Sequence, residues 1–388
     1  MERLQGGHCW IYSNELVRAP KHLEPGQLVN IKSESGDWVG RGYYNPISTI
    51  ALRLLTSDRS PIDEAFLDLR IGEAQALRER IFPGEEAYRL IFGEADGLPG
   101  LIVDRYGSVL VAQFLTAGMD RLCPALVSLL AARFKPSAIL ARNDAASRRR
   151  EGLPQEKKIL YGELSSPVVI RKNGLVFEVD VWEGQKTGFF LDQGENYSVL
   201  EGRARGARVL DAFCYSGGWG IHALSYGAES VLGLDVSDRA IGLARVNALR
   251  NPMQERIDFR QEELFEGLRR RQKASERFDL IVLDPPSFAK ERGATRDALR
   301  GYKEINRSAM LLLSSGGTLI SCSCSHWVDA QSFRKVLAEA ARDARRPFRI
   351  SAWRTQGRDH PIALGIPETQ YLQCAILEES THPPLYQP

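Results

Sequence analysis

The sequence places two thiols two residues apart in LISCSCSHW, where Cys322 and Cys324 end an apolar run that follows a Gly-Gly turn. Such thiols could fill a core, clip a metal, form a redox pair or supply a nucleophile. A metal clip is disfavoured because no partner pair stands at ligand spacing, and redox pairs more often read Cys-x-x-Cys. Strand periodicity puts both side chains on one face, with Cys322 deeper and Cys324 at the rim.

A second chemical stretch is VLDPPSFAK, in which Asp284-Pro285-Pro286-Ser287-Phe288 follows an apolar strand. The two prolines exclude a helix, end the ladder of hydrogen bonds and form a rigid rim. The aspartate can hold an exocyclic amino group, and Phe288 offers a stacking face. This combination suits a planar nitrogenous base taken out of its stack. A plain turn at the end of a strand is the alternative interpretation.

A loop of small residues follows another apolar strand in LDAFCYSGGWGIHAL, which spans residues 210–224. Gly217, Gly218 and Gly220 let the backbone approach a ligand closely, although the loop is not GxGxxG and is weak by itself. No GK[ST] follows it, which disfavours a nucleoside triphosphate. A nicotinamide cofactor is the serious competitor, and the Asp-Pro-Pro stretch weighs against it.

Acidic residues end the next two strands. Asp235 could accept both hydroxyls of a ribose. It could instead cap the following helix, but Ser237 and Asp238 stand better placed for that role. Glu262 and Glu263 end the strand after it, where an acceptor could meet an adenine amino group.

These stretches need a scaffold that gathers the ends of strands. From about residue 183 the sequence alternates strand and helix patterns to the C-terminus. Such alternation predicts a doubly wound, mostly parallel sheet, whose ligands sit beyond the carboxyl ends of the strands. Cys324 and Asp284 would then face one cleft from neighbouring strands.

The preceding residues divide into two further blocks. Residues 1–73 read as short strands around turns such as Ser35-Gly36-Asp37, which predicts a small β-barrel. Helical periodicity follows from Pro61 to Arg80, with Leu69 and Ile71 on its apolar face. Residues 74–182 mix strands, a Gly-rich loop and a helix, and we expect a mixed α/β middle domain. Residues 183–388 would form the third domain.

The composition is that of an ordinary globular protein, with 43% hydrophobic and 26% charged residues among 388. No apolar run reaches the roughly 18 residues of a membrane helix, and the N-terminus lacks a secretory pattern, so we expect a cytoplasmic protein. The net charge of +2 is uninformative, but 51 basic side chains include only 11 lysines. The arginine excess favours phosphate contacts, and a codon bias would produce the same skew.

The Asp-Pro-Pro loop and the LDAFCYSGG segment together resemble class I S-adenosylmethionine-dependent methyltransferases. The fuller match is to the bacterial 23S rRNA cytosine-5 methyltransferases with an N-terminal PUA domain, and it covers nearly the whole chain. It rests on segments in the expected order, which are GHCWIYSNEL, YNPISTIALRLLT, GEADGLPGLIVDRYG, RNDAASRRREGL, GQKTGFFLDQ, RGYKEIN and SCS. The resemblance implies a PUA domain, a mixed α/β middle domain and a Rossmann-like catalytic domain with a seven-stranded sheet.

The resemblance also implies roles for individual residues. S-adenosylmethionine would be bound by Gln193, Asp211, Tyr215, Ser216, Gly217, Gly218, Asp235, Val236, Glu263 and Asp284. The target base in large-subunit ribosomal RNA would meet Pro285, Pro286 and Phe288. Three arginines of the RNDAASRRREGL segment would contact RNA phosphates, although a solvated charged turn is the alternative; they are Arg142, Arg148 and Arg149. We expect no metal and no membrane, and a homodimer stays open.

Methylation at C5 of cytosine needs a thiol, because C5 is a poor nucleophile until a nucleophile adds at C6. Thiolate suits that step, since it attacks readily and can also leave. Cys324 occupies the family's Ser-Cys-Ser position and is predicted to be the nucleophile, with Asp284 beside the base. Cys322 is interpreted as core filling.

Three departures from the family pattern stand out. Other RNA cytosine-5 methyltransferases carry a second cysteine after the strand-four proline to release the product, where this chain has Ser287. The base that removes the C5 proton is therefore unnamed. Cys9 replaces a proline, and Gly194 stands where an arginine is usual.

Two rival functions stay open. An exocyclic N-methyltransferase acting on guanine N2 or adenine N6 would use the same Asp-Pro-Pro loop without a covalent step. An RNA-binding assembly factor with a vestigial cofactor site would need neither. His326 and the Asp359-His360-Pro361 segment lie on loops that could border the cleft, and we assign them no catalytic role.

Overall fold

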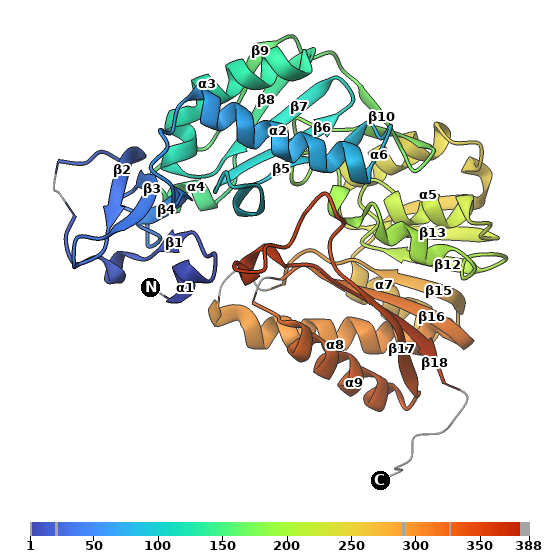
Figure 1. Ribbon diagram of the computed structural model, residues 1–388. Coiled ribbons are helices and arrows are strands. Elements are labelled where there is room, and N and C mark those ends of the chain that lie inside the picture. Colours follow the sequence, from blue (N-terminus) through green and yellow to red (C-terminus); the bar gives the residue numbers. More distant parts are fainter. Residues whose placement is uncertain (1, 20–21, 289–291, 326, 381–388) are drawn as a thin grey trace. The chain divides into compact units, whose positions relative to one another are not determined.

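The structure, a computed structural model, describes residues 2–19, 22–288, 292–325 and 327–380. His326 lies outside these described residues. The chain forms two compact units, each built from separate segments (Figure 1). The first unit comprises residues 1–174, 179–192 and 358–369, and the second comprises residues 175–178, 193–357 and 370–388.

The first unit begins with a small antiparallel sheet in the order β1-β4-β3-β2. A short helix α1 (Glu2–Gln5) precedes it, and its strands are β1 (Trp10–Ile11), β2 (Gln27–Lys32), β3 (Trp38–Tyr44) and β4 (Leu52–Thr56). The apolar residues that alternate along these strands meet in a small core around Ile31, Tyr44 and Leu52. The predicted N-terminal block of short strands is therefore present, with a first strand of only two residues.

A larger sheet follows in the same unit, in the order β5-β6-β7-β8-β9. Its elements are α2 (Glu64–Ile81), β5 (Ala87–Phe92), β6 (Leu101–Tyr106), β7 (Val109–Phe114), α3 (Ala117–Phe134), β8 (Ala138–Asn143), α4 (Ser147–Arg150) and β9 (Glu156–Gly162). Only the β7–β8 pair is parallel among the neighbours described, and α3 makes the crossover that a parallel pair requires. Ile71 of α2 is buried as predicted, but Leu69 is 58% exposed, because the buried stripe instead follows Leu67, Ile71 and Ala74.

Tyr43 of β3 contacts residues that flank the larger sheet of the first unit. The Tyr43 hydroxyl donates to the Pro99 carbonyl at 2.7 Å and lies 2.9 Å from the Thr116 hydroxyl. Its ring covers Gly118 in the first turn of α3 so closely that a Cβ there would come within 2.4 Å of ring carbons. Glycine at 118 is thus required by the close approach of strand β3.

The second unit contains the seven-stranded sheet. Among the described residues its order is β14-β13-β12-β15-β16-β18-β17, parallel except for β18, which is antiparallel to both of its neighbours. The strands are β12 (Arg208–Ala212), β13 (Ser230–Asp235), β14 (Ile257–Gln261), β15 (Phe278–Leu283), β16 (Leu313–Ser323), β17 (Phe348–Arg354) and β18 (Gln373–Glu379). The order reverses beside β12, so its carboxyl end marks the switch point where ligands bind in such sheets.

Helices cover both faces of this sheet (Figure 1). They are α5 (Gly218–Ser225), α6 (Asp238–Leu249), α7 (Leu264–Lys273), α8 (Thr295–Leu312) and α9 (Ala330–Ala344). One core packs α7, α8 and α9 against side chains such as Leu283 and Leu319. The other packs α5 against Val209 and Leu280, which alternate to the opposite face. The predicted Rossmann-like domain with a seven-stranded, mostly parallel sheet is confirmed.

Two strands and seven short 3₁₀ helices complete the described elements. The strands are β10 (Val168–Lys172) in the first unit and β11 (Leu175–Val179), and the 3₁₀ helices span Ser13–Glu15, Gly93–Asp96, Leu191–Gln193, Asn196–Leu200, Gln254–Arg256, Arg292–Ala294 and Pro367–Thr369.

The segment 358–369 packs with the first unit rather than with the rest of 183–388, the range predicted to form one domain. The buried Asp359 carboxylate accepts from the Arg89 backbone at 3.0 Å, and the Asp359 carbonyl accepts from the buried Arg78 guanidinium at 2.7 Å. Buried arginines need such acceptors, and these acceptors come from a distant part of the chain. The three-domain division by itself stays a prediction.

We expect Gly118→Ala to destabilise the protein by about 2–3 kcal/mol, because the new methyl group overlaps the Tyr43 ring. Gly242→Ala in α6 is the matched control, since its Cβ meets nothing within 4 Å; it should stabilise by about 0.5–1 kcal/mol. Urea denaturation of both variants measures the difference. Equal stabilities would contradict the close approach of β3 and α3.

Candidate active site

The loop after β12 is held in an unusual conformation. Phe213, Tyr215 and Gly217 all have positive φ, at 65°, 47° and 84°. Such angles are costly for residues with a Cβ and persist only when the surroundings impose them. A Cβ at Gly217 would lie 2.8 Å from the Phe259 ring, and one at Gly218 would lie 2.5 Å from the Tyr197 hydroxyl. The loop is therefore a tight turn that leads into α5.

Asp211, at the end of β12, lies beneath this turn and is fully buried. Its Oδ2 accepts from the Gly220 backbone at 2.8 Å, while Oδ1 is buried without a hydrogen-bond partner among the described residues. Burial raises the pKa of Asp211 to about 8, with smaller contributions from the charges of Asp284 and Asp235, and the Gly220 N–H opposes the rise. A cation placed near these carboxylates would relieve their repulsion.

Asp235 ends the neighbouring strand β13. Its Oδ2 accepts from the Tyr215 backbone at 3.0 Å, and its Oδ1 accepts from the Ser237 backbone at 2.9 Å. The N-cap of α6 is Ser237, whose hydroxyl accepts from the Ala240 backbone, which confirms that Ser237 is better placed than Asp235 for this role. The carboxylate is thus oriented, and each oxygen keeps a second lone pair for a diol.

The remaining predicted cofactor residues border the same edge of the sheet. Val236 is 63% exposed, and its carbonyl accepts from Gln261 at 3.1 Å. Ser216 is buried, with its carbonyl bonded to Asn247. Glu263 caps α7 by accepting from Glu266 at 2.8 Å, a role that its sequence position did not suggest. Its predicted contact with adenine stays a prediction.

Asp284 follows β15, the strand on the other side of β12. Its Oδ2 accepts from the Trp219 indole at 3.0 Å and from the Gln193 amide at 3.1 Å. Gln193 is held in turn by Asn196, which donates to its Oε1 at 2.7 Å. Sequence reasoning missed Trp219 and Asn196. The available signal is the position of the tryptophan directly after the glycine turn, which is itself a predicted part of the site.

Cys324 lies just beyond β16 and is half-buried. Its Sγ is 3.8 Å from the Pro285 carbonyl, which places the thiol against the loop that carries Asp284. Cys322 is fully buried and pairs in register with Cys374 of β18. Burial, with Cys374 adding to it, raises the pKa of Cys322 far above its usual range, so this thiol is inert. The interpretation of Cys322 as core filling is confirmed.

Phe288 packs into a cluster of aromatic rings. Its centroid lies 4.7 Å from that of Tyr302, with Phe213 and Phe265 at 6.4 and 6.5 Å. Part of the ring is thereby committed to the core. Stacking of a base on Phe288 and contact of a base with Pro285 and Pro286 stay predictions.

The prediction that Arg142 and Arg148 contact RNA phosphates is wrong, because both guanidinium groups are buried and bonded within the first unit. Arg142 donates to the carbonyls of Val181 and Gly184 at 2.8 and 2.9 Å. Arg148, with 0% exposure, donates to the carbonyls of Phe114 and Pro154 and to Asp120.

Arg149 differs from these two arginines in being exposed at the surface, where it donates to Gln155. Its predicted contact with RNA stays a prediction.

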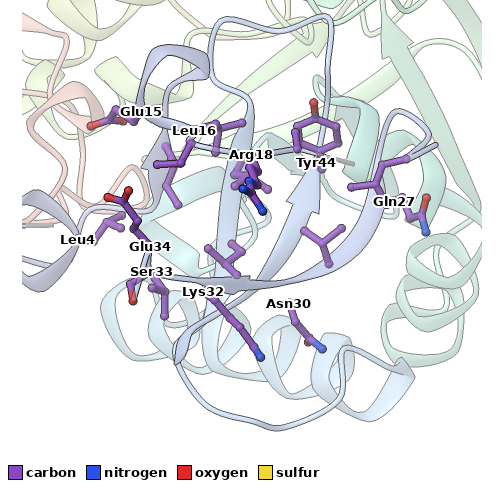
Figure 2. A pocket seen from close by; sticks show the side chains of 18 of the residues that line it. Leu4, Glu15, Leu16, Arg18, Gln27, Asn30, Lys32, Ser33, Glu34 and Tyr44 are labelled. Atoms are coloured by element: carbon purple, nitrogen blue, oxygen red, sulfur yellow. The ribbon is translucent and has the colours of Figure 1, made fainter. Parts of the chain in front are cut away.

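A cavity of about 950 Å³ opens beside the N-terminal sheet, and all of its lining residues belong to the first unit (Figure 2). Apolar side chains such as Leu16 and Tyr44 line it together with the polar Arg18, Gln27 and Lys32. It contains none of the carboxylates or thiols described above.

No helix among the described residues is long and apolar enough to cross a membrane. Within the same part of the chain, no group of three or more histidine, cysteine, aspartate and glutamate side chains stands ready to hold a metal ion.

Comparison with known families agrees with this geometry. The sequence profile of the S-adenosylmethionine-dependent methyltransferases matches residues 147–351, and that of the PUA-like domain matches residues 1–57. Two solved structures share the fold over 97% of both chains at 18% identity. One is a proposed SAM-dependent methyltransferase from Streptococcus mutans, with a TM-score of 0.84, and the other is a proposed methyltransferase complexed with SAH, at 0.85. Fold and profile together define a methyltransferase that uses S-adenosylmethionine.

Curated relatives narrow the class. The Ribosomal RNA large subunit methyltransferase I of Shewanella amazonensis is 41% identical over 95% of this chain and 94% of its own length. The protein of the same name from Tolumonas auensis is 40% identical over 95% of both chains. The chain therefore belongs to the ribosomal RNA large subunit methyltransferase I family.

The residues present fit the cofactor. S-adenosylmethionine carries a sulfonium and an ammonium cation, and the edge of the sheet offers the buried Asp211, with one unpartnered oxygen, together with Asp235 and Asp284. The glycine turn leaves no room for a Cβ at Gly217 or Gly218. We expect Asp211 to face the methionine part and Asp235 the ribose.

Stability should depend on pH through Asp211. Because its pKa is raised to about 8, the folded protein keeps a proton that the unfolded chain loses near pH 4. The stabilisation is therefore present at low pH and is lost as the pH rises towards 8. Without cofactor, the melting temperature of the wild type minus that of Asp211→Asn should fall between pH 5 and pH 8. A difference that does not vary with pH would contradict the raised pKa.

Mutation can distinguish the structural role of the buried Arg148 from that of the exposed Arg149. We expect Arg148→Ala to cost about 3 kcal/mol, because it leaves buried acceptors without their donor. Arg149→Ala should stay within about 0.5 kcal/mol of the wild type. Chemical denaturation tests both, and a neutral Arg148→Ala would contradict the structural role.

Proposed function

We propose that this chain methylates C5 of a cytosine in large-subunit ribosomal RNA through a covalent bond between Cys324 and C6 of the base. The observation that carries the proposal is the position of Cys324, half-buried beyond β16 with its Sγ 3.8 Å from the Pro285 carbonyl. Strands β15 and β16 are parallel neighbours, so the thiol and Asp284 leave the sheet at the same edge.

The choice of ribosomal RNA rests on two supports. The curated relatives that match the chain almost end to end are named as ribosomal RNA large subunit methyltransferases I. The PUA-like region at residues 1–57 adds a separate element that we expect to bind RNA. Arg149 is the arginine of the predicted cluster that stays available for a phosphate.

The thiol activates the base by addition. Attack of the Cys324 thiolate on C6 makes the ring an enamine whose C5 is nucleophilic. S-adenosylmethionine supplies the electrophilic methyl group. Loss of the C5 proton then restores the C5–C6 double bond and expels the thiolate. Each step needs the base held flat against the rim formed by Pro285 and Pro286, within reach of the sulfur.

Asp284 is suited to orient the base. Its Oδ2 is fixed by two donors, Trp219 and Gln193, so the carboxylate cannot rotate freely. A carboxylate fixed in this way can accept from the exocyclic amino group of cytosine. Because folding already orders this aspartate, binding of the base costs less conformational entropy.

An exocyclic N-methyltransferase would use the same loop without needing a thiol. The thiol of Cys324 is packed against that loop, and this contact favours the covalent mechanism. The two mechanisms differ in whether the enzyme needs Cys324.

We expect Cys324→Ala to lower the methylation rate at least about 10³-fold, because the variant lacks the thiol that adds at C6. Binding of S-adenosylmethionine, measured by calorimetry, should be unchanged. Cys322→Ala is the matched control from the same strand, and it should retain turnover while losing about 1 kcal/mol of stability.

Two further measurements complete this test. Wild-type enzyme should form a denaturant-stable complex with RNA that contains 5-fluorocytosine, and Cys324→Ala should not. Bisulfite sequencing of ribosomal RNA from cells with and without the gene should identify the target cytosine. Normal turnover of Cys324→Ala would exclude the covalent mechanism and favour N-methylation of an exocyclic amino group.

A further inference from the structure

Two buried side-chain amides link Asp284 to a distant part of the same unit. Gln193 and Asn196 lie in consecutive 3₁₀ helices, and each is only 2% exposed. The Asn196 Nδ2 donates to the Gln193 Oε1 at 2.7 Å and to the Thr355 carbonyl at 3.0 Å. The Gln193 Nε2 donates to the Asp284 Oδ2 at 3.1 Å. The hydrogen bonds therefore connect the Thr355 backbone, through two amides, to the Asp284 carboxylate.

The partners at the two ends determine which way each amide points. A backbone carbonyl only accepts hydrogen bonds, so the Asn196 atom that faces Thr355 is the nitrogen Nδ2. The other proton of Nδ2 goes to Gln193, which therefore presents Oε1 to Asn196 and Nε2 to the Asp284 carboxylate. If the Gln193 amide turned over, its oxygen would face a carboxylate oxygen and its nitrogen would face the Asn196 nitrogen. Asn196 therefore selects the orientation in which Gln193 donates to Asp284.

The Thr355 carbonyl is held in place by the sheet. Thr355 directly follows β17, whose last residue Arg354 pairs with Cys374 of β18. Asp284 directly follows β15, and strands β16 and β18 lie between β15 and β17. The amide pair thus crosses the carboxyl edge of the sheet and fixes Asp284 relative to a strand that carries none of the predicted site residues.

Both donors to the Asp284 Oδ2 depend on one short 3₁₀ helix, Asn196–Leu200. The Trp219 indole, which is the other donor at 3.0 Å, packs edge-on against Tyr197 of this helix, with ring centroids 4.9 Å apart at an interplanar angle of 87°. A packed indole can direct only its one N–H, whereas a glutamine amide can present either a nitrogen or an oxygen. The bond from Gln193 is therefore the one that needs a partner to set its direction, and the first residue of the helix provides it.

We propose that Asn196 is a positioning residue for methylation, which acts through Gln193 to hold the Asp284 carboxylate in the orientation that the target base requires. The inference rests on the proposed role of Asp284 in binding the base and deepens it. Asn196 acts at a distance from the reacting atoms, because it reduces the number of orientations that Asp284 samples before the base binds. Loss of Asn196 should therefore slow turnover while the cofactor still binds.

The first test truncates Asn196. Asn196→Ala should lower kcat about 10–100-fold on ribosomal RNA or ribosomal particles from cells without the gene, whichever the wild type methylates. The rate is divided by the number of sites that bind S-adenosylmethionine in calorimetry, so that unfolded protein is not counted. KM for the RNA and the dissociation constant of S-adenosylmethionine should be unchanged. A kcat per binding site equal to that of the wild type would overturn the inference.

Asn251→Ala is the matched control. Asn251 is also a buried asparagine of the second unit, and its Nδ2 donates to the carbonyls of Val176 and Asn247 at 2.9 and 2.8 Å. Its loss should lower the melting temperature by an amount similar to that of Asn196→Ala, without slowing turnover per binding site. An equal fall of kcat in the two variants would reveal a general effect of destabilisation and would contradict a positioning role.

A double-mutant cycle tests whether Asn196 acts through Gln193. Gln193→Ala removes the donor to Asp284 and should lower kcat by at least as much as Asn196→Ala. Once the glutamine side chain is absent, removal of Asn196 as well should change kcat little further. Effects that multiply in the double variant would mean that Asn196 acts by another route, which the inference does not allow.

Gln193→Glu keeps the test decisive if Asn196→Ala does not fold. This variant replaces the Nε2 donor with an oxygen of similar size, which repels the Asp284 carboxylate. Its kcat should fall at least as far as that of Gln193→Ala. A wild-type kcat would exclude the hydrogen bond from Gln193 as a requirement for turnover, and with it the role of Asn196.

Failure of this inference is distinct from failure of the proposed function. Asp284→Asn keeps the shape of the side chain and removes its charge, so a wild-type kcat in this variant would remove the proposed role of Asp284. A slow Asp284→Asn together with a normal Asn196→Ala would remove only the role of Asn196. A wild type that forms no complex with RNA containing 5-fluorocytosine would remove the covalent step and leave these rate comparisons intact.

Discussion

Burial of a carboxylate at the carboxyl edge of the seven-stranded sheet is the constraint on which the site depends. Asp211, Asp235 and Asp284 stand at the ends of three adjacent parallel strands, and burial, ahead of the charges of Asp284 and Asp235, makes ionisation of Asp211 costly. The protein meets this cost with backbone and side-chain donors from the glycine turn, α5 and Gln193. The strained turn and the two prolines are understandable as the means of holding those donors and charges in place.

The parts of the site that are local in sequence could be predicted. The glycine turn, the Asp-Pro-Pro loop and the terminal cysteine each follow an apolar strand, and parallel strands bring such ends together. The separation of Cys322 from Cys324 likewise needed only strand periodicity and depth.

What the sequence could not show depends on contacts between distant residues. The sequence does not distinguish an arginine that contacts phosphate from one that donates to a buried carbonyl. For Arg142 and Arg148 the acceptors are the carbonyls of Val181, Gly184 and Phe114. The packing of residues 358–369 with the first unit could not be predicted for the same reason, because it depends on contacts with buried arginines of that unit. Asn196 escaped notice since one of its partners, the Thr355 carbonyl, lies 159 residues later in the sequence.

The bond between the Trp219 indole and Asp284 has a further consequence. Trp219 stands next to the glycine turn, yet its indole N–H donates to Asp284 in the loop after β15. A single hydrogen bond therefore ties the start of α5 to the loop after β15, and neither the Trp219 nor the Asp284 side chain can shift without breaking that bond.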